Sequence, residues 1–439
     1  SIRFREAATD ISLARLEDSL PDGSAVVDYM IFREQDESKL QVAILRKEEG
    51  ESQYDHYLFE DLEGINAAIK EYRELIQDED ADDDEIMEFG MEVYTKVWAP
   101  IAEKLGEIEN VYVVPDGMLN ILPFNAMVTE DELYLLQAVD LHTISSSRDL
   151  IPSDVPLASG GYMIMAGPDY DTDEVTGKSV LASIKGKRSA SAAQQSMRGM
   201  SHGMRGLNFD PLPGAEKEGR LIQEQTGKGE VVTRLIQKKK AQEKLLRSME
   251  EPPEVLHIAT HGFFLKPNEG LKKRLKKLQR GGGSQLPPPG DNPLLRAGLA
   301  FAGLNANAPM LGEMDTDNDG VLTALEVLGL NLSGTRVAIL SACETGLGEI
   351  HEGEGVYGLR RSFQEAGAAA VVNSLWEVSD AGTQALMIGL YQRMLEGEST
   401  HEALRNTQLE MLDSDEWNYP YVWSAFFMVE GTKRAESNS

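Results

Sequence analysis

The stretch Arg336-Val-Ala-Ile-Leu-Ser-Ala-Cys-Glu-Thr-Gly346 has the form of a buried strand that runs into a turn just after a cysteine. A second stretch, Val255-Leu-His-Ile-Ala-Thr-His-Gly262, is another apolar strand, and it ends in His-Gly. Short, mostly apolar runs favour strands of a parallel sheet that is covered on both faces. Ligands of open α/β sheets bind beyond the carboxyl ends of the strands, so these two exits predict a reactive site with Cys343 and His261.

Cys343 and His261 are residue types suited to nucleophilic catalysis. A free thiol has a pKa near ~8.5, and a nearby imidazole can accept its proton and later protonate a leaving amine. The backbone N–H groups of Gly262 and Cys343 are the predicted donors to the oxyanion. The pattern alone leaves open that Cys343 is a small buried hydrophobic residue. It indicates a structural role for His257, which lies in the middle of its strand.

The rest of the chain alternates apolar strands with amphipathic helices, which predicts an α/β fold. We expect strands at 25–32, 41–45, 111–114, 162–166, 255–259, 337–341 and 368–375, and helices at 62–76, 85–105, 215–225, 238–249, 355–366 and 380–395. A chain of 439 residues is long for one domain. The linker-like sequence IPSDVPLASGG predicts a boundary near residue 155, which gives units 1–155 and 156–431 and a tail 432–439.

Composition narrows the classes of partner. The net charge of −31 argues against nucleic acid, because phosphate contacts need a basic surface. No apolar run approaches the length that crosses a membrane. The single cysteine, Cys343, rules out an intrachain disulfide and a zinc site of several thiolates, and it fits a cytoplasmic location.

Several motifs resemble the CHAT family, caspase-like peptidases named for their association with tetratricopeptide (TPR) repeats. The similar segments are VYVVPDGMLNILPFNAM (111–127), LHTISSSRDL (141–150), LPGAEKE (212–218), HIATHGFF (257–264), LSACETGLG (340–348), GEGVYGLRRSFQEAGAAAVVNSLWEVSD (353–380) and YPYVWSAFFMVEG (419–431). The resemblance implies a caspase-like three-layer sandwich with a mostly parallel central sheet, in two related subdomains. The N-terminal subdomain would be degenerate, because it has no cysteine.

The same resemblance implies a cysteine endopeptidase whose dyad is Cys343 and His261. The TPR repeats of the family are absent from this sequence, so the resemblance implies regulation by a separate protein or by an upstream TPR region. The chemistry itself needs no cofactor. The alternatives are a catalytically silent caspase-like scaffold and a calcium-responsive interaction module.

The segment NSLWEVSD (373–380) also resembles separase, a related peptidase, in which the final aspartate binds the P1 arginine. Asp380 falls on that position, so we expect cleavage of protein substrates after Arg or Lys. The alternative is that Asp380 caps the helix that follows it. Glu344 and Asp169 are further candidates for contact with substrate.

The stretch 171–206 is locally basic and rich in Gly, Ser, Ala and Met. A flexible segment of this kind is open to proteolysis, so Arg188, Arg198 and Arg205 are candidate sites of self-cleavage. A solvated loop without this role is the alternative interpretation.

The stretch DTDNDGVLTALE (315–326) fits the pattern of an EF-hand calcium loop. Its second half resembles what CHAT proteins carry at this place, and the segment before it is a poor helix, which an EF-hand requires. Calcium is therefore a secondary hypothesis. Its candidate ligands are Asp315, Asp317, Asp319, Val321 and Glu326.

Overall fold

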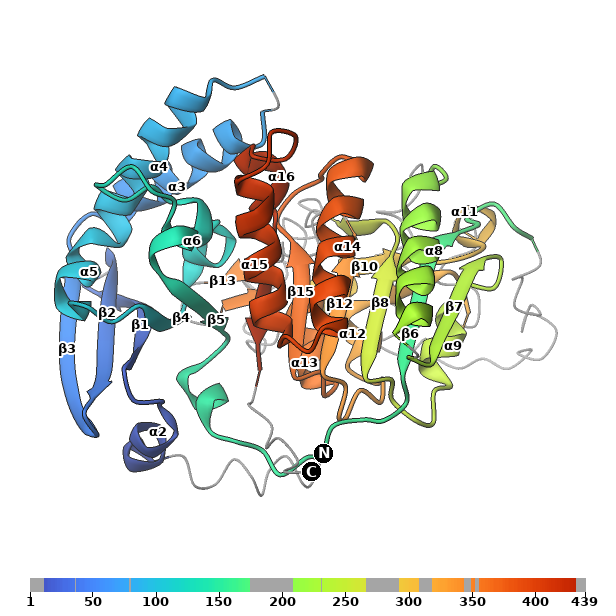
Figure 1. Ribbon diagram of the computed structural model, residues 1–439, viewed down its shortest axis with the longest axis horizontal. Coiled ribbons are helices and arrows are strands. Elements are labelled where there is room, and N and C mark those ends of the chain that lie inside the picture. The colour runs from blue at the N-terminus through green and yellow to red at the C-terminus, as the bar shows by residue number, and fades with distance from the viewer. Residues whose placement is uncertain are drawn as a thin grey trace, which may run out of the picture.

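The computed structural model describes residues 12–35, 37–78, 80–173, 208–229, 231–265, 292–307, 318–342, 349–351 and 355–431. Within these residues, eleven strands form one continuous sheet (Figure 1). Their order across the sheet is β3 (Glu51–Phe59), β2 (Glu37–Glu48), β1 (Ser24–Glu34), β4 (Asn110–Val114), β5 (Asp140–Ile144), β16 (Phe426–Glu430), β15 (Ala370–Ser374), β12 (Val337–Ser341), β8 (Val255–Ala259), β6 (Tyr162–Pro168) and β7 (Thr233–Lys238).

Most neighbouring strands of this sheet are parallel. The antiparallel pairs are β1–β2, β2–β3 and β15–β16. The central strands β8, β12 and β15 are buried along their whole length, as expected for strands covered on both faces. The predicted α/β class with a mostly parallel sheet is confirmed.

Helices cover both faces of the sheet, which makes the three layers. One face carries α3 (Leu62–Ile76), α4 (Asp83–Val97), α5 (Ala99–Leu105), α8 (Pro213–Lys228), α14 (Asp380–Leu395) and α15 (Thr400–Leu412). In Figure 1, α8, α14 and α15 lie side by side in front of the strands. The other face carries α9 (Glu243–Arg247), α12 (Ala324–Val327) and α13 (Leu359–Glu365).

Strand β8 shows how one sequence supplies both cores. Its residues Val255 and Ala259 pack into the core under α8 and α14, whereas Leu256 and Ile258 pack into the core on the opposite face. Successive side chains of a strand point to opposite faces, so a fully apolar strand is what a two-sided sheet needs. His257 interrupts this pattern on the α8 side.

The sheet joins the two parts of the chain through its C-terminal strand. β16 lies between β5 and β15, and its parallel pairing with β5 is short: Val429 lies opposite Thr143 and Glu430 opposite Ile144. The boundary near residue 155 falls in the connection from β5 to β6 and stays a prediction. Among the described residues, no helix has the length and apolarity needed to cross a membrane.

Three helix predictions need correction. The predicted helix at 85–105 is two helices, because α4 ends at Val97 and α5 begins at Ala99 with a proline in its first turn. Proline has no backbone N–H for the helical hydrogen bond, which explains this break. The predicted helix at 238–249 is reduced to the short α9, because residue 238 still belongs to β7. The predicted helix at 355–366 begins only at Leu359, because residues 355–357 form the short strand β14 (Gly355–Tyr357).

Candidate active site

Strands β8 and β12 end together at one edge of the sheet. They pair in parallel with Ala259 opposite Ser341, and the N–H of Thr260 donates to the carbonyl of Ser341 at 3.2 Å. His261 follows Ala259 by two residues. Several predicted site residues lie outside the described residues: Cys343, Glu344, Asp315, Asp317, Arg188, Arg198 and Arg205.

The imidazole of His261 is held by a backbone carbonyl. Its Nε2 lies 2.9 Å from the carbonyl oxygen of Asp210. A carbonyl oxygen can only accept, so Nε2 carries the hydrogen and the Nδ1 lone pair of the neutral ring stays available as a base. The rings of Tyr170 and Phe209 flank the imidazole, with centroids 5.4 Å and 5.5 Å from its own.

Hydrogen bonds through Tyr170 and Thr260 also hold the backbone of His261 in place. The buried hydroxyl of Tyr170 lies 2.8 Å from Oγ1 of Thr260 and accepts a 3.4 Å hydrogen bond from the N–H of His261. Oγ1 of Thr260 in turn donates to the carbonyl of Ala300 at 2.5 Å. The turn between β8 and β9 (Gly262–Phe264) is therefore tied to two other segments of the chain.

Asn305 holds the segment that contacts His261. Its side-chain oxygen accepts from the N–H of Phe209 at 3.0 Å, and its Nδ2 donates to the carbonyl of Phe209 at 2.9 Å. The same Nδ2 lies 2.8 Å from Oδ1 of Asp171. Sequence reasoning missed the supporting residues Tyr170, Asp210 and Asn305, because their contacts with the site are long-range.

The pairing of β9 fixes the direction of the N–H of Gly262, a predicted oxyanion donor. β9 pairs antiparallel with β10 (Ala297–Ala300), with Gly262 opposite Leu299. The N–H of Ala300 donates to the carbonyl of His261, one residue earlier, so the pair Gly262–Leu299 is a non-hydrogen-bonded one. The N–H of Gly262 therefore points away from β10.

Asp380 is exposed in the first turn of α14, and its carboxylate lies over the first turn of α8. The N-cap of α14 is Ser379, whose Oγ accepts from the N–H of Gly382 at 3.2 Å, so the capping role belongs to Ser379. A Cβ added to Gly214 would lie 2.1 Å from Cγ of Asp380. Because Asp210 contacts His261, the segment 210–214 connects the imidazole to this carboxylate.

Asp169 follows β6 and is exposed. Its carboxylate accepts from the N–H of Asp171 at 3.3 Å, and its carbonyl accepts from the N–H of Gly303 at 3.0 Å. These bonds make it part of the turn that leads to Tyr170.

A buried polar group lies behind the strand exits. His257 is fully buried, with Nε2 2.8 Å from Oε1 of Glu218 and Nδ1 3.2 Å from the hydroxyl of Tyr391. The hydroxyl of Ser341 donates to the other oxygen of Glu218 at 3.1 Å. The group connects α8, β8, β12 and α14, which agrees with the structural interpretation of His257.

The described part of the EF-hand-like stretch has its carboxylates engaged within the protein. Oε2 of Glu326 accepts from the N–H and the hydroxyl of Thr323, both at 2.9 Å, and Oε1 lies 3.1 Å from Arg247. Asp319 accepts from the N–H of Val321 at 3.0 Å. Burial, together with the charge of Glu326, raises the pKa of Asp319 to about 8. Calcium binding stays a prediction.

Comparison with known proteins decides the family. The family model of the CHAT domain matches residues 87–431. The chain belongs to the CHAT family. This confirms the resemblance read from the motifs of the sequence.

The curated relatives are much longer than this CHAT chain. It is 24% identical over 323 residues to tetratricopeptide repeat protein 28 of Homo sapiens, and the aligned residues cover 71% of this chain and 12% of that protein. The Mus musculus protein of the same name is 24% identical over 237 residues, 53% of this chain and 9% of that one. The chain thus spans about a tenth of the length of these relatives.

Solved structures with a similar arrangement are distant in sequence. The Arg-specific cysteine proteinase gingipain R is 8% identical with a TM-score of 0.39, over 85% of this chain and 74% of that one. The Saccharomyces cerevisiae separase–securin complex is 9% identical with a TM-score of 0.44, over 95% of this chain and 30% of that one.

Proposed function

We propose that this CHAT protein is a cysteine endopeptidase in which Cys343 is the nucleophile and His261 the acid and base. The supporting observation is the register of β8 and β12, in which Ala259 lies opposite Ser341. His261 and Cys343 each follow these paired residues by two positions. Because the two strands are parallel and in this register, His261 and Cys343 both follow the carboxyl ends of the strands at one edge of the sheet, where ligands of α/β sheets bind.

The proposed reaction follows from the tautomer of His261. Nδ1 takes the thiol proton while Nε2–H stays on the carbonyl of Asp210. The thiolate attacks the peptide carbonyl carbon, and the oxyanion receives hydrogen bonds from the N–H groups of Gly262 and Cys343. His261 then gives its proton to the amine nitrogen as the C–N bond breaks. Water, deprotonated by His261, attacks the thioester and releases the acid, and the proton returns to the sulfur.

The proposed specificity is for Arg or Lys at P1, with Asp380 as the partner of the basic side chain. An exposed carboxylate beside the segment that supports His261 suits a cationic substrate group. Glu344 and Asp169 are the further proposed contacts with substrate. Asp380→Asn should abolish cleavage after Arg while leaving the reaction of the thiol with a small electrophile unchanged.

A cleavage profile on a peptide library tests the activity directly. The chain is compared with Cys343→Ala and His261→Ala, and His56→Ala on the exposed edge strand β3 serves as the matched histidine control. We expect cleavage after basic residues that both site variants lose and the control keeps. Cleavage that persists in Cys343→Ala refutes the proposal. So does an unaltered chain that cleaves no peptide and whose thiol does not react with an Arg-directed electrophile.

Self-processing at Arg188, Arg198 or Arg205 is a further part of the proposal. Mass spectrometry of the purified chain should find new termini after these arginines, and the Cys343→Ala chain should lack them. Identical termini in both chains would mean that another protease cuts there.

Regulation is proposed through protein partners or calcium. The relatives are named for tetratricopeptide repeats, which supports a TPR region or a TPR protein as the regulatory partner. Calcium is tested by calorimetry on the chain and on Asp319→Asn. No heat of binding with the unaltered chain removes calcium from the scheme.

A further inference from the structure

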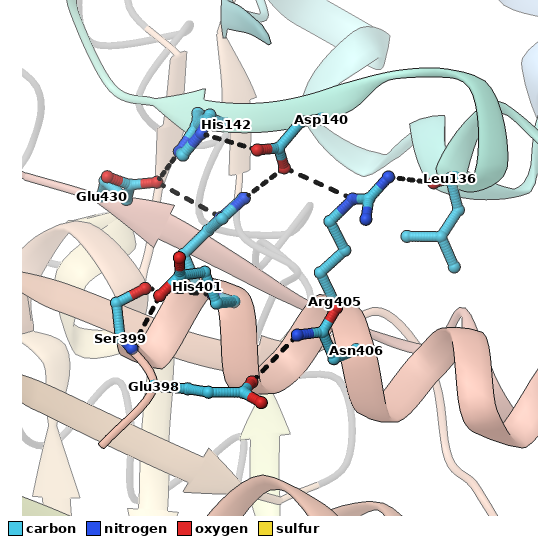
Figure 2. Close-up of polar contacts among 10 residues, drawn as sticks. Leu136, Asp140, His142, Glu398, Ser399, His401, Arg405, Asn406 and Glu430 are labelled. Carbon is cyan, nitrogen blue, oxygen red and sulfur yellow. Dashed lines mark hydrogen bonds and ion pairs between the residues drawn. The ribbon is translucent and has the colours of Figure 1, made fainter. Parts of the chain in front are cut away.

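Four ionisable side chains meet where the two parts of the sheet join (Figure 2). Asp140 and His142 lie two residues apart on β5, so their side chains share one face of the strand. His401 lies in the first turn of α15, and Glu430 ends β16. None of them belongs to the proposed peptidase site, and no motif of the sequence brings them together.

The two imidazoles are stacked. The rings of His142 and His401 lie 3.7 Å apart between centroids with an interplanar angle of 14°, and Tyr112 stacks on the far side of His142 at 4.6 Å. The side chains of His142 and His401 are only 13% and 15% exposed. Two nearly buried imidazoles at this distance need negative charge beside them if either is cationic.

Glu430 fixes the orientation of both rings. Its Oε1 lies 2.5 Å from Nδ1 of His142 and 3.5 Å from Nδ1 of His401. A carboxylate oxygen accepts, so Nδ1 of His142 carries a hydrogen for Glu430, and Nε2 of His401 carries one for Oδ1 of Asp140. Both Nε2 atoms face toward Asp140, and a bound ion would take the place of the hydrogen on Nε2 of His401. Figure 2 shows this arrangement, with Glu430 on one side of the rings and Asp140 on the other.

Asp140 completes a group of three ligand atoms. Its Oδ2 lies 3.7 Å from Nε2 of His142, and its Oδ1 lies 2.8 Å from Nε2 of His401. One ligand atom each of Asp140, His142 and His401 lie within 4.8 Å of one another. Arg405 forms an ion pair with the same carboxylate of Asp140, with its Nε 3.3 Å from Oδ1. Histidine ligands of metals commonly donate their other ring N–H to a carboxylate, which is the position of Glu430.

The donor set selects the kind of ion. Two imidazole nitrogens and one carboxylate oxygen suit Zn²⁺ and similar transition metals, whereas Ca²⁺ and Mg²⁺ prefer oxygen ligands alone. Ligands of tetrahedral zinc lie about 3.3 Å apart, so the side chains must close by up to about 1.5 Å, and one imidazole must turn out of the stack, when an ion enters.

We propose that Asp140, His142 and His401 bind a divalent transition-metal ion such as Zn²⁺ through one carboxylate oxygen and the two Nε2 atoms, with Glu430 as the positioning carboxylate. The ion ties β5 to α15 and β16 at the junction where only two residue pairs join the strands. It therefore stabilises the connection between the N-terminal and C-terminal parts of the sheet.

Zinc titration of the chelator-treated chain tests the proposal. The Cys343→Ala background removes the thiol as a competing ligand, so the result does not depend on the proposed peptidase. We expect about one tight site by calorimetry, which Asp140→Asn and His401→Gln both lose. Glu430→Gln, which removes only the partner of the Nδ1 atoms, should weaken binding by about 10–100-fold. His56→Ala on β3 is the matched control and keeps full affinity.

Cobalt gives a readout of the ligands themselves. Co²⁺ at a site with two imidazoles and one carboxylate should give visible absorption bands that disappear in His401→Gln, while circular dichroism of the variants shows that they fold. The melting temperature should rise with Zn²⁺ for the chain and for His56→Ala only. No binding, or binding that persists in both Asp140→Asn and His401→Gln, overturns the proposal. The cluster is then a group of ion pairs without a metal, in which burial lowers the pKa of His142 but Asp140 and Glu430 raise it to about 9.

Discussion

Replacing Gly214 by alanine should move the carboxylate of Asp380 while leaving the stability of the fold nearly unchanged. A Cβ at this position would lie 2.1 Å from Cγ of Asp380 and 2.2 Å and 2.3 Å from its two oxygens. Carbon atoms in contact lie about 3.5 Å apart, so the carboxylate must move by at least about 1.4 Å. Asp380 is exposed, so its side chain can rotate away at a cost of about 0.5–1.5 kcal/mol.

The same substitution favours the helix. Alanine in place of glycine adds up to about 1 kcal/mol of helix propensity, which offsets the rotation of Asp380. We therefore expect Gly214→Ala to change the free energy of unfolding by less than about 1 kcal/mol. A displacement of 1 Å in a positioning group can cost about 100-fold in rate. The value of kcat/KM for Arg-P1 peptides should therefore fall by about 10–100-fold.

The assay compares two glycines of the same helix. Gly227 is exposed near the end of α8, and a Cβ there would meet nothing within 4 Å. Gly227→Ala should raise the free energy of unfolding in urea by about 0.5–1 kcal/mol and leave kcat/KM unchanged. If Gly214→Ala cleaves Arg-P1 peptides as fast as Gly227→Ala does, Asp380 does not bind the P1 residue from the position seen here. A large loss of stability in Gly214→Ala would contradict the expected rotation.

Three further predictions concern the buried pair of His257 and Glu218, the carboxyl group of Asp149, and the support of His261. Glu218→Gln should lower the free energy of unfolding in urea by about 3 kcal/mol, because it removes the buried carboxylate that lies 2.8 Å from His257; a loss below about 0.5 kcal/mol would show that this contact contributes little to stability. Burial raises the pKa of Asp149 to about 6, so its contribution to stability is present below the unfolded pKa near ~4 and is lost as the pH rises through 6. From pH 4 to pH 7, the free energy of unfolding of Asp149→Asn should therefore rise by up to about 3 kcal/mol relative to that of the unaltered chain. A difference between the two chains that does not change with pH would contradict this. Asn305→Ala should lower kcat by about tenfold with little change in KM, because it loosens the segment that orients His261; unchanged kcat in a peptide assay would show that this support is dispensable.

Local pattern predicted the elements that are buried on every side or strongly amphipathic. The helices α3 and α14 begin and end where the spacing of apolar residues indicated, and the strands β8 and β12 match their apolar runs. The edge strand β3 was missed because most of its side chains are exposed and polar. The edge strand β7 and the short β5 were missed because their polar residues hide the pattern.

The candidate dyad could be named from the sequence because strand exits, glycines and the family motifs all occur within short stretches of chain. The residues that hold His261 in place could not be named from the sequence. Asp210 is 51 residues from His261 along the chain, and their contact depends on how α8 packs beside β8. The cap of α14 by Ser379 also needed the structure, since Ser379 and Asp380 are both natural cap residues.

The sequence by itself determined the apolar strands β8 and β12, the amphipathic helices α3 and α14, and the family that the motifs match, because the spacing of apolar residues and helix propensity act within a few residues along the chain. Only the tertiary structure decided which distant side chains meet. Asp140 and His401 are 261 residues apart, and β16 brings their elements together by inserting beside β5. Strand order and register arise from packing between remote segments, and no local pattern of side chains encodes them.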